Sequence, residues 1–235
     1  MSIVENLARV RERIAAAARR AGRNPKEITL LGVSKTFPVE RIREAHAAGL
    51  RVFGENRVQE FADKAGSLHD LADAEWHLIG HLQSNKAAKA AGLFGAIDSV
   101  DSVRLAEKLN GAAENACKTL PILIEINVGG EDAKSGIAPA SQELEQILLA
   151  APSWGNLKVR GLMTVPPYAE NPEEARPFFR HLREIRDQIS SRKLSAIGME
   201  VLSMGMSHDF DVAIEEGSTC VRVGTAIFGL RESRE

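Results

Sequence analysis

The sequence predicts an α/β protein, a (β/α)8 TIM barrel preceded by one extra N-terminal helix. Apolar runs typical of buried parallel strands alternate with helical patterns roughly eight times along the chain. The length of 235 residues suits eight such units. An open doubly wound sheet is the alternative, but it should carry a Gly-rich dinucleotide turn after its first strand, and none is present.

Composition narrows the class of protein further. The net charge is -2 and acidic and basic residues are mixed along the chain, which argues against a nucleic-acid partner. Cys117 and Cys220 lie in no metal-binding spacing, and a disulfide framework is not expected, which fits the reducing cytoplasm. No apolar run is long enough to span a membrane, and early charges interrupt any signal-peptide core. No linker divides the chain, so we expect a single domain over residues 1–235.

The first half of the chain is expected to contain five helices and four strands. Ile3, Leu7, Val10 and Ile14 recur at helical spacing, so a helix should run to about Ala21 and cover one end of the barrel. Apolar runs bounded by turn residues predict the strands, and Pro, Ser or Asp before a helical pattern and Gly after it predict the helix ends. The expected strands are residues 28–35, 51–55, 75–80 and 96–100. Four later helices are expected: one over about 38–48, one that begins near 58, one that ends at 91, and one over 103–116.

The second half continues the alternation. The expected strands are residues 121–128, 157–165, 201–204 and 220–228, and the expected helices are 140–150, 172–192 and 209–216. A glycine-rich loop over 129–136 and a Pro166-Pro167 break separate these elements.

The C-terminal ends of barrel strands face one mouth, so residues far apart in the sequence should meet there. Lys35 ends the first strand. The loops after the last two strands, around 203–207 and 224–225, are rich in glycine and hydroxyl residues. Glycine lets backbone N–H groups approach an anion, and barrels commonly bind phosphate at these two loops.

A lysine amine and a phosphate site in one mouth are what pyridoxal 5'-phosphate (PLP) requires. The amine must be neutral to condense with the PLP aldehyde, and burial or a nearby cation favours that form. Arg222 is a candidate for this cation.

Six motifs together resemble the pyridoxal phosphate homeostasis protein family, the YggS-like proteins. They are GVSK (32–35), FGENRVQE (53–60), WHLIGHLQSNK (76–86), GLMT (161–164), LSMGMS (202–207) and VRVGTAIFG (221–229). The resemblance implies a barrel similar to the alanine racemase N-terminal domain, with PLP held as a Schiff base on Lys35. It also implies that Arg222 faces the pyridine nitrogen. It places the phosphate on Ser203, Gly205, Ser207, Gly224 and Thr225, and the ring beside Asn56 and Met163.

The resemblance implies PLP (vitamin B6) homeostasis without catalytic turnover, with PLP-dependent apoenzymes as possible recipients, in a monomer. An arginine at the pyridine nitrogen fits this role, because it does not serve as a proton donor there and leaves the ring a weaker electron sink. A racemase of the alanine racemase type is the alternative. It needs a second proton carrier, and the single tyrosine, Tyr168, lies in a Pro-rich loop. A barrel enzyme that forms a Schiff base or binds a phosphate sugar without a cofactor is the third possibility.

Three other motifs carry less weight. His77 and His81 are two potential metal ligands where three or four are needed, so no metal site is expected. Ser207, His208 and Asp209 are adjacent and cannot face one another as a catalytic triad. Residues 129–136 lack the glycines of a phosphate-binding P-loop, so a flexible loop is the better interpretation.

Overall fold

The computed structural model describes residues 2–131 and 135–230. The strands are β1 (Thr29–Val33), β2 (Val52–Glu55), β3 (Glu75–Leu78), β4 (Ala96–Val100), β5 (Leu120–Glu125), β6 (Leu157–Met163), β7 (Ile197–Met206) and β8 (Cys220–Val223). The helices are α1 (Ile3–Arg20), α2 (Val39–Ala47), α3 (Val58–Ala65), α4 (Ala87–Leu93), α5 (Val103–Asn115), α6 (Gln142–Ala150), α7 (Arg176–Ser191), α8 (Phe210–Glu215) and α9 (Thr225–Phe228).

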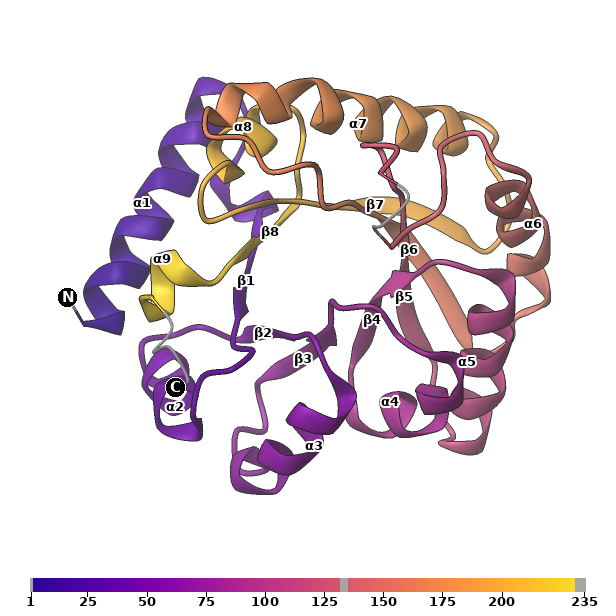
Figure 1. Cartoon of the computed structure of the whole chain (residues 1–235), viewed down its shortest axis with the longest axis horizontal. Coiled ribbons are helices and arrows are strands. Elements are labelled where there is room, and N and C mark those ends of the chain that lie inside the picture. The colour runs from indigo at the N-terminus through magenta and orange to yellow at the C-terminus, as the bar shows by residue number, and fades with distance from the viewer. Residues whose placement is uncertain (1, 132–134, 231–235) are drawn as a thin grey trace.

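The described strands form a closed barrel. Each strand pairs in parallel with the next in sequence, and β8 pairs with β1 to complete the circle. The helices surround the strands on the outside, as Figure 1 shows. The predicted barrel is therefore confirmed, and the open sheet is excluded.

The main core lies between the strands and the outer helices. Aromatic side chains illustrate this layer: Trp76 of β3 lies 4.9 Å from Phe53 of β2 and 4.7 Å from Phe61 of α3, between ring centroids. Phe61 in turn packs on Phe94, with centroids 4.9 Å apart. Burial of such large apolar surfaces supplies most of the favourable free energy of folding.

Helix α1 belongs to the outer ring, so the expectation that it covers one end of the barrel is wrong. Its buried stripe packs beside α8, α9 and α2 (Figure 1). Asn6 donates to the carbonyl of Ile227 at 2.9 Å, and Arg11 donates to the carbonyl of Gly49 at 2.7 Å. The short α9 cannot cover the space beside β8 and β1, and α1 fills it.

Two predicted strands differ most from the observed ones. The strand expected over 201–204 is longer, because β7 begins at Ile197 and ends at Met206. The strand expected over 220–228 ends at Val223, and the apolar residues after Gly224 form α9 instead. A short apolar run has no periodicity long enough to separate strand from helix, which explains the second error.

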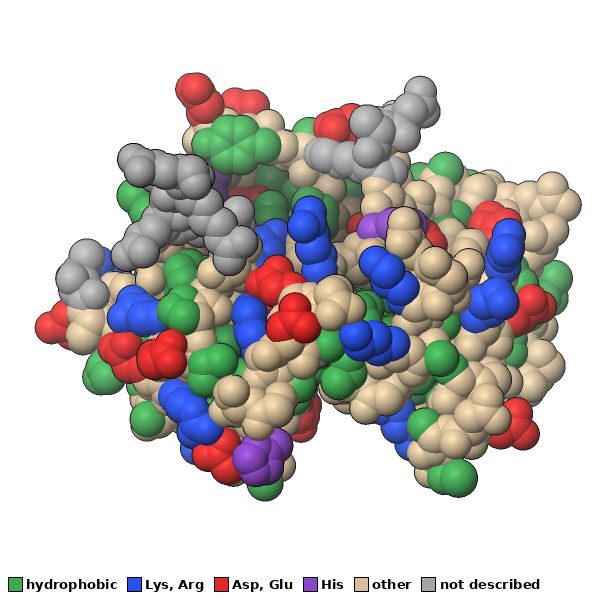
Figure 2. Space-filling view, turned by 60° about the horizontal axis from the view of Figure 1, so that its bottom comes forward, with side chains coloured by type: hydrophobic (Ala, Val, Ile, Leu, Met, Phe, Trp, Pro, Cys, Tyr) green, Lys and Arg blue, Asp and Glu red, His purple; other side chains and the backbone are tan. Residues whose placement is uncertain are grey.

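The surface carries charges of both signs. Figure 2 shows Lys and Arg interspersed with Asp and Glu over one face of the molecule. In residues 2–131 and 135–230, no helix is both long enough and apolar enough to cross a bilayer.

Gly205 is expected to be essential for stability. Its φ is +94°, and a Cβ there would lie 2.5 Å from the Cβ of Ala213 in α8. Gly205→Ala should therefore lower the free energy of unfolding by about 2–4 kcal/mol through backbone strain and overpacking. Urea unfolding measures this change. Gly111→Ala is the control, because Gly111 lies in α5 with open space around it, and there alanine should stabilise the helix by up to ~1 kcal/mol. Equal effects at both positions would contradict the packing argument.

Candidate functional site

The structure brings the nine predicted site residues to the C-terminal end of the barrel. They lie in the C-terminal halves of the strands or in the loops that follow them: Lys35 after β1, Asn56 after β2, Met163 at the end of β6, Ser203 and Gly205 in β7, Ser207 after β7, Arg222 in β8, and Gly224 and Thr225 after β8. Lys35 was expected within the first strand, but it follows Val33 in a turn and is half-buried.

The turn that carries Lys35 is held by α3 on one side of the lysine and by the end of β2 on the other. On one side, Thr36 adopts a φ of +68°, and its N–H donates to Glu60 Oε1 at 2.5 Å. On the other, the Ser34 hydroxyl donates to Glu55 Oε1 at 2.7 Å. Lys64 Nζ joins these parts, 2.8 Å from Glu60 Oε1 and 3.4 Å from Glu55 Oε1. The network fixes the backbone from which the Lys35 side chain extends.

Burial has an electrostatic effect in this network. Glu55 is fully buried, and desolvation raises the pKa of its carboxyl despite the nearby ammonium of Lys64. Glu60 is less buried, and its hydrogen bonds with Lys64 and Thr36 outweigh desolvation and lower its pKa. Neither carboxylate was identified from the sequence. The i,i+4 spacing of Glu60 and Lys64 on α3 is a signal that could have indicated Glu60, whereas Glu55 lies at the end of β2, outside that helix.

The loops after β7 and β8 meet at the Ser207 hydroxyl. Ser207 Oγ accepts hydrogen bonds from the N–H of Gly224 at 3.1 Å and from the N–H of Ala226 at 3.3 Å. A hydroxyl and two converging N–H groups form a donor set of the kind that binds an anionic oxygen. Ala226 was not among the predicted site residues, because a backbone donor leaves no mark on the sequence.

Arg222 lies inside the barrel and is 3 % exposed. Its Nη1 donates to Ser203 Oγ and its Nη2 donates to the carbonyl of Thr164, each at 2.7 Å. Burial lowers the pKa of Arg222, while Asp98, Glu125 and Asp209 act in the opposite direction. The guanidinium is thereby fixed below the mouth, between β6, β7 and β8.

Two residues expected at the phosphate, Ser203 and Gly205, instead contact other parts of the protein. Ser203 is fully buried and is engaged by Arg222. Gly205 provides room for α8, as its contacts with Ala213 show. Both residues thus belong to the packed layer of side chains, formed with Arg222 and α8, that lies beneath Ser207.

Asn56 follows β2, the strand that pairs with β1, and it lies beside a groove. A cavity of about 410 Å³ is lined there by Asn56, Arg57, Val58, Gln59, His81, Leu82, Gln83 and Lys86. Met163 is fully buried at the end of β6, where it pairs in register with Ser203 and with Glu125.

Glu125, the last residue of β5, is a titratable group that the sequence did not single out. It is 6 % exposed, and its Oε2 has no hydrogen-bond partner among the described residues. Burial and the nearby carboxylate of Asp101 raise the pKa of Glu125 to about 7, although Arg222 and His81 lower it. A buried acceptor of this kind is rare, because an unmade hydrogen bond is costly.

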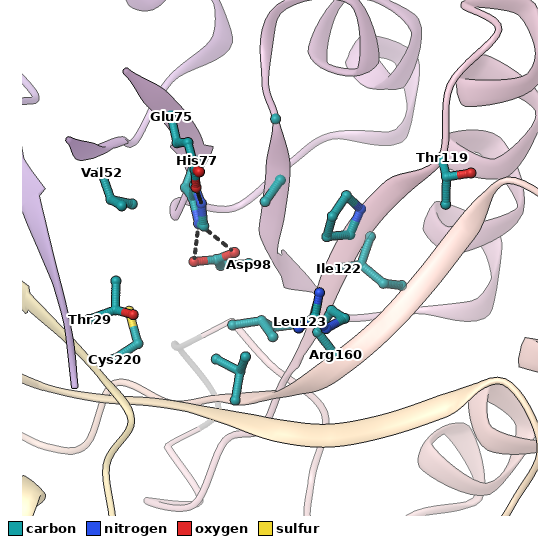
Figure 3. Close-up of a pocket in the computed structure, with 14 residues that line it drawn as sticks. Thr29, Val52, Glu75, His77, Asp98, Thr119, Ile122, Leu123, Arg160 and Cys220 are labelled. Atoms are coloured by element: carbon teal, nitrogen blue, oxygen red, sulfur yellow. Dashed lines mark hydrogen bonds and ion pairs between the residues drawn. The ribbon is translucent and has the colours of Figure 1, made fainter. Parts of the chain in front are cut away.

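A larger cavity, about 550 Å³, opens at the other end of the barrel. It is lined by the first residues of several strands, among them Thr29, Val52, Glu75 and Cys220. Figure 3 shows His77 pointing toward Asp98, with Nδ1 and Oδ2 3.1 Å apart. In barrel enzymes this end serves stability, whereas binding residues gather at the opposite end. Cavity size alone would therefore direct attention away from the end that carries the nine predicted site residues.

Other sequence motifs can now be placed. His77 pairs with Asp98, whereas His81 pairs with Asp101 at 3.0 Å. Within the described ranges, no three His, Cys, Asp or Glu side chains gather as a metal site. His208 Nε2 lies 2.8 Å from the carbonyl oxygen of Glu170, outside the hydrogen bonds of Ser207. The loop over 129–136 lies partly outside the described residues.

Comparisons with known proteins agree with this geometry. The family model of the alanine racemase N-terminal domain matches residues 6–232. A pyridoxal phosphate homeostasis protein from Aquifex aeolicus is 50% identical over 233 residues, covering 99% of this chain and 100% of that protein. The chain belongs to the pyridoxal phosphate homeostasis protein family. Its Escherichia coli K12 member is 44% identical over 232 residues, covering 98% of this chain and 97% of the relative.

Solved structures give the same fold. PipY of Synechococcus elongatus, determined with PLP bound, matches with a TM-score of 0.84 at 37% identity and covers 97% of this chain and 100% of its own. An alanine racemase of Clostridium difficile matches with a TM-score of 0.74 at 14% identity, covering 99% of this chain and 57% of its own. The second likeness shows the barrel alone.

The pair formed by half-buried His77 and buried Asp98 should make the stability of this family member pH dependent. Burial alone would lower the pKa of His77, but Asp98 and, to a lesser extent, Glu75 raise it to about 10. Because the folded-state pKa is raised, the contribution is complete below about pH 6.5 and is lost as the pH rises through 10.

Asp98→Asn should lower the free energy of unfolding by about 1–3 kcal/mol at neutral pH and reduce its decline between pH 7 and 10.5. Chemical unfolding across this range measures both effects. Asp187→Asn, at an exposed ion pair of α7, is the control and should change little. A parallel decline in wild type and Asp98→Asn would contradict this role of the pair.

Proposed function

We propose that the chain binds PLP at the C-terminal end of the barrel, holds it as a Schiff base on Lys35, and serves PLP homeostasis without catalytic turnover. The observation that carries the proposal is that the Lys35 turn and the donors around Ser207 follow neighbouring strands. β1 pairs with β8, and a Cβ on Gly224 would lie 3.4 Å from the Cβ of Val33. An amine and an anion site are thus adjacent.

The residues present fit the coenzyme. When bound, PLP supplies an electrophilic aldehyde and an electron sink. Lys35, in its neutral form, would supply the amine that holds the coenzyme as a Schiff base. The backbone network of Thr36, Glu60 and Lys64 orients this lysine.

The phosphate is assigned to Ser207, Gly224 and Thr225, with the N–H of Ala226 as a further donor. The two N–H groups that meet at Ser207 Oγ are placed to share their hydrogen bonds with a phosphate oxygen. Ser203 and Gly205 act one layer below, by holding Arg222 and by admitting α8.

Arg222, Asn56 and Met163 are assigned to the coenzyme ring. Arg222 has five N–H donors in all, and two of them are engaged by Ser203 and Thr164. A guanidinium keeps its protons at physiological pH, so it favours a neutral pyridine ring and a weak electron sink. This supports binding and delivery to PLP-dependent apoenzymes over turnover. Racemisation would need a second proton carrier, and Tyr168 is 79% exposed on a surface loop.

Lys35→Ala should abolish covalent coenzyme binding. The wild-type protein mixed with PLP should show a near-visible absorption band that borohydride fixes onto the peptide containing Lys35. The variant should show neither the band nor the modified peptide. Lys108→Ala, an exposed lysine of α5, is the control and should behave as wild type. A wild-type protein that stays colourless with PLP would overturn the proposal.

Absence of turnover is tested on the same preparations. Free amino acids incubated in D2O with the PLP-loaded protein should keep their α-hydrogens, as followed by NMR. Exchange or racemisation that disappears in Lys35→Ala would replace the proposed role with that of a racemase.

Ser207→Ala tests the phosphate assignment by comparing two ligands. The variant should bind PLP about tenfold more weakly, because a hydrogen bond to a charged group contributes about 1.5 kcal/mol or more. Its affinity for pyridoxal, which has no phosphate, should change by less than about twofold. Absorbance titrations of wild type and variant with both ligands give the four constants. Equal losses for the two ligands would show that Ser207 does not act on the phosphate.

A further inference from the structure

The mouth contains a buried carboxyl group, that of Glu125, to which the proposed function gives no role. Glu125 ends β5, where its register partner is Met163, one of the residues assigned to the coenzyme ring. Its side chain is buried and Oε2 lacks a hydrogen-bond partner among the described residues. A Cβ on Gly136 would lie 3.2 Å from Glu125 Cγ, so the chain after β5 passes directly beside it. An acceptor placed in this way is expected to meet a donor or to carry a proton.

The charged groups around Glu125 come from three other elements. Asp101, after β4, opposes ionisation of the carboxyl, whereas Arg222 of β8 and His81, after β3, favour it. The neighbouring end of β6 adds the uncharged residues Met163 and Thr164. Arg222 directs two donors to Ser203 and Thr164, and His81 is paired with Asp101. Near neutral pH, with a pKa of about 7, Glu125 is divided between its two forms.

We propose that Glu125 binds the coenzyme in its protonated form, as a hydrogen-bond donor to an anionic oxygen of the ligand, so that coenzyme retention weakens as this carboxyl ionises. The inference rests on the proposed function, because it requires PLP in the mouth. PLP carries a phosphate and a phenol oxygen, so an ionised carboxylate beside it would repel the ligand, whereas a neutral carboxyl donates. A ligand that places an ammonium group beside Glu125 would instead bind better to the ionised carboxylate.

The expected change in the apparent Kd for PLP follows from the fraction of the protein in which Glu125 is protonated. If only the protonated form binds, the apparent Kd increases by the inverse of that fraction. With a pKa of about 7, the increase is about twofold at pH 7 and about tenfold at pH 8, and it is negligible at pH 6.

Glu125→Gln is the decisive variant, because glutamine has the same shape, stays neutral and retains a donor. The Kd for PLP is measured by absorbance titration between pH 6 and 8.5 in wild type, in this variant and in Glu107→Gln, a matched control on the exposed face of α5. The ratio of wild-type to Glu125→Gln Kd should rise from about 1 at pH 6 to about tenfold at pH 8. The pH dependence of Lys35 itself is common to both proteins and cancels in the ratio.

Proton uptake gives a second readout. Calorimetry in buffers of different ionisation enthalpy should show that PLP binding at pH 7.5 takes up about 0.8 proton more in wild type than in Glu125→Gln. Asp101→Asn removes a neighbouring charge that raises the pKa of Glu125, so it should move the onset of weakened binding to lower pH. This variant also tests the inference if Glu125→Gln does not fold.

The outcomes separate this inference from the proposed function. A flat Kd ratio in proteins that both bind PLP at Lys35 would overturn the role of Glu125 and leave the proposed function intact. A ratio that falls with pH would show that Glu125 acts in its ionised form, which also overturns it. Failure of every variant and of the wild type to bind PLP would remove both.

Discussion

The buried guanidinium of Arg222 is the interaction on which the mouth of the barrel depends. A cation taken out of water costs several kcal/mol unless partners replace the lost hydration. Here two hydrogen bonds tie it to β6 and β7, and Asp98, Glu125 and Asp209 surround it with negative charge. The strands that carry the binding loops are therefore held together by a group that itself faces the proposed ligand.

This arrangement divides the mouth into two layers. The lower layer is packed and fully bonded: Ser203 accepts from Arg222, and Gly205 fits under α8. The upper layer contains the groups that can exchange partners, namely Ser207 and the two N–H groups that donate to it. A rigid lower layer places these donors before the ligand arrives, which reduces the ordering cost of binding. The network of Lys64, Glu55 and Glu60 has the same effect on the Lys35 turn.

The sequence predicted the barrel because strand and helix periodicities alternate over the whole chain, and it predicted which residues would reach the mouth because strand ends in a barrel converge. It failed where several elements act together. The position of α1 depends on the short length of α9. The apolar residues after Gly224 were predicted as strand, so this helix was not expected. The roles of Ser203 and Gly205 depend on neighbours 19 and 8 residues away, Arg222 and Ala213. Ala226 acts through its backbone, and Glu125 is distinguished by one oxygen that has no hydrogen-bond partner within residues 2–131 and 135–230.

The two ends of the barrel hold buried acidic groups in different ways, and this difference indicates their roles. At the N-terminal end, Asp98 has a committed partner in His77, so its charge is balanced within the protein (Figure 3). At the C-terminal end, Glu125 shares its surroundings with Asp101, which pairs with His81, and Oε2 of Glu125 has no hydrogen-bond partner in the described part of the chain. A committed pair contributes to stability and gains nothing from a ligand. An uncommitted carboxyl reduces stability, and a ligand that engages it recovers that free energy as affinity. The group left without a partner among the described residues is therefore found at the end of the barrel where we propose that PLP binds.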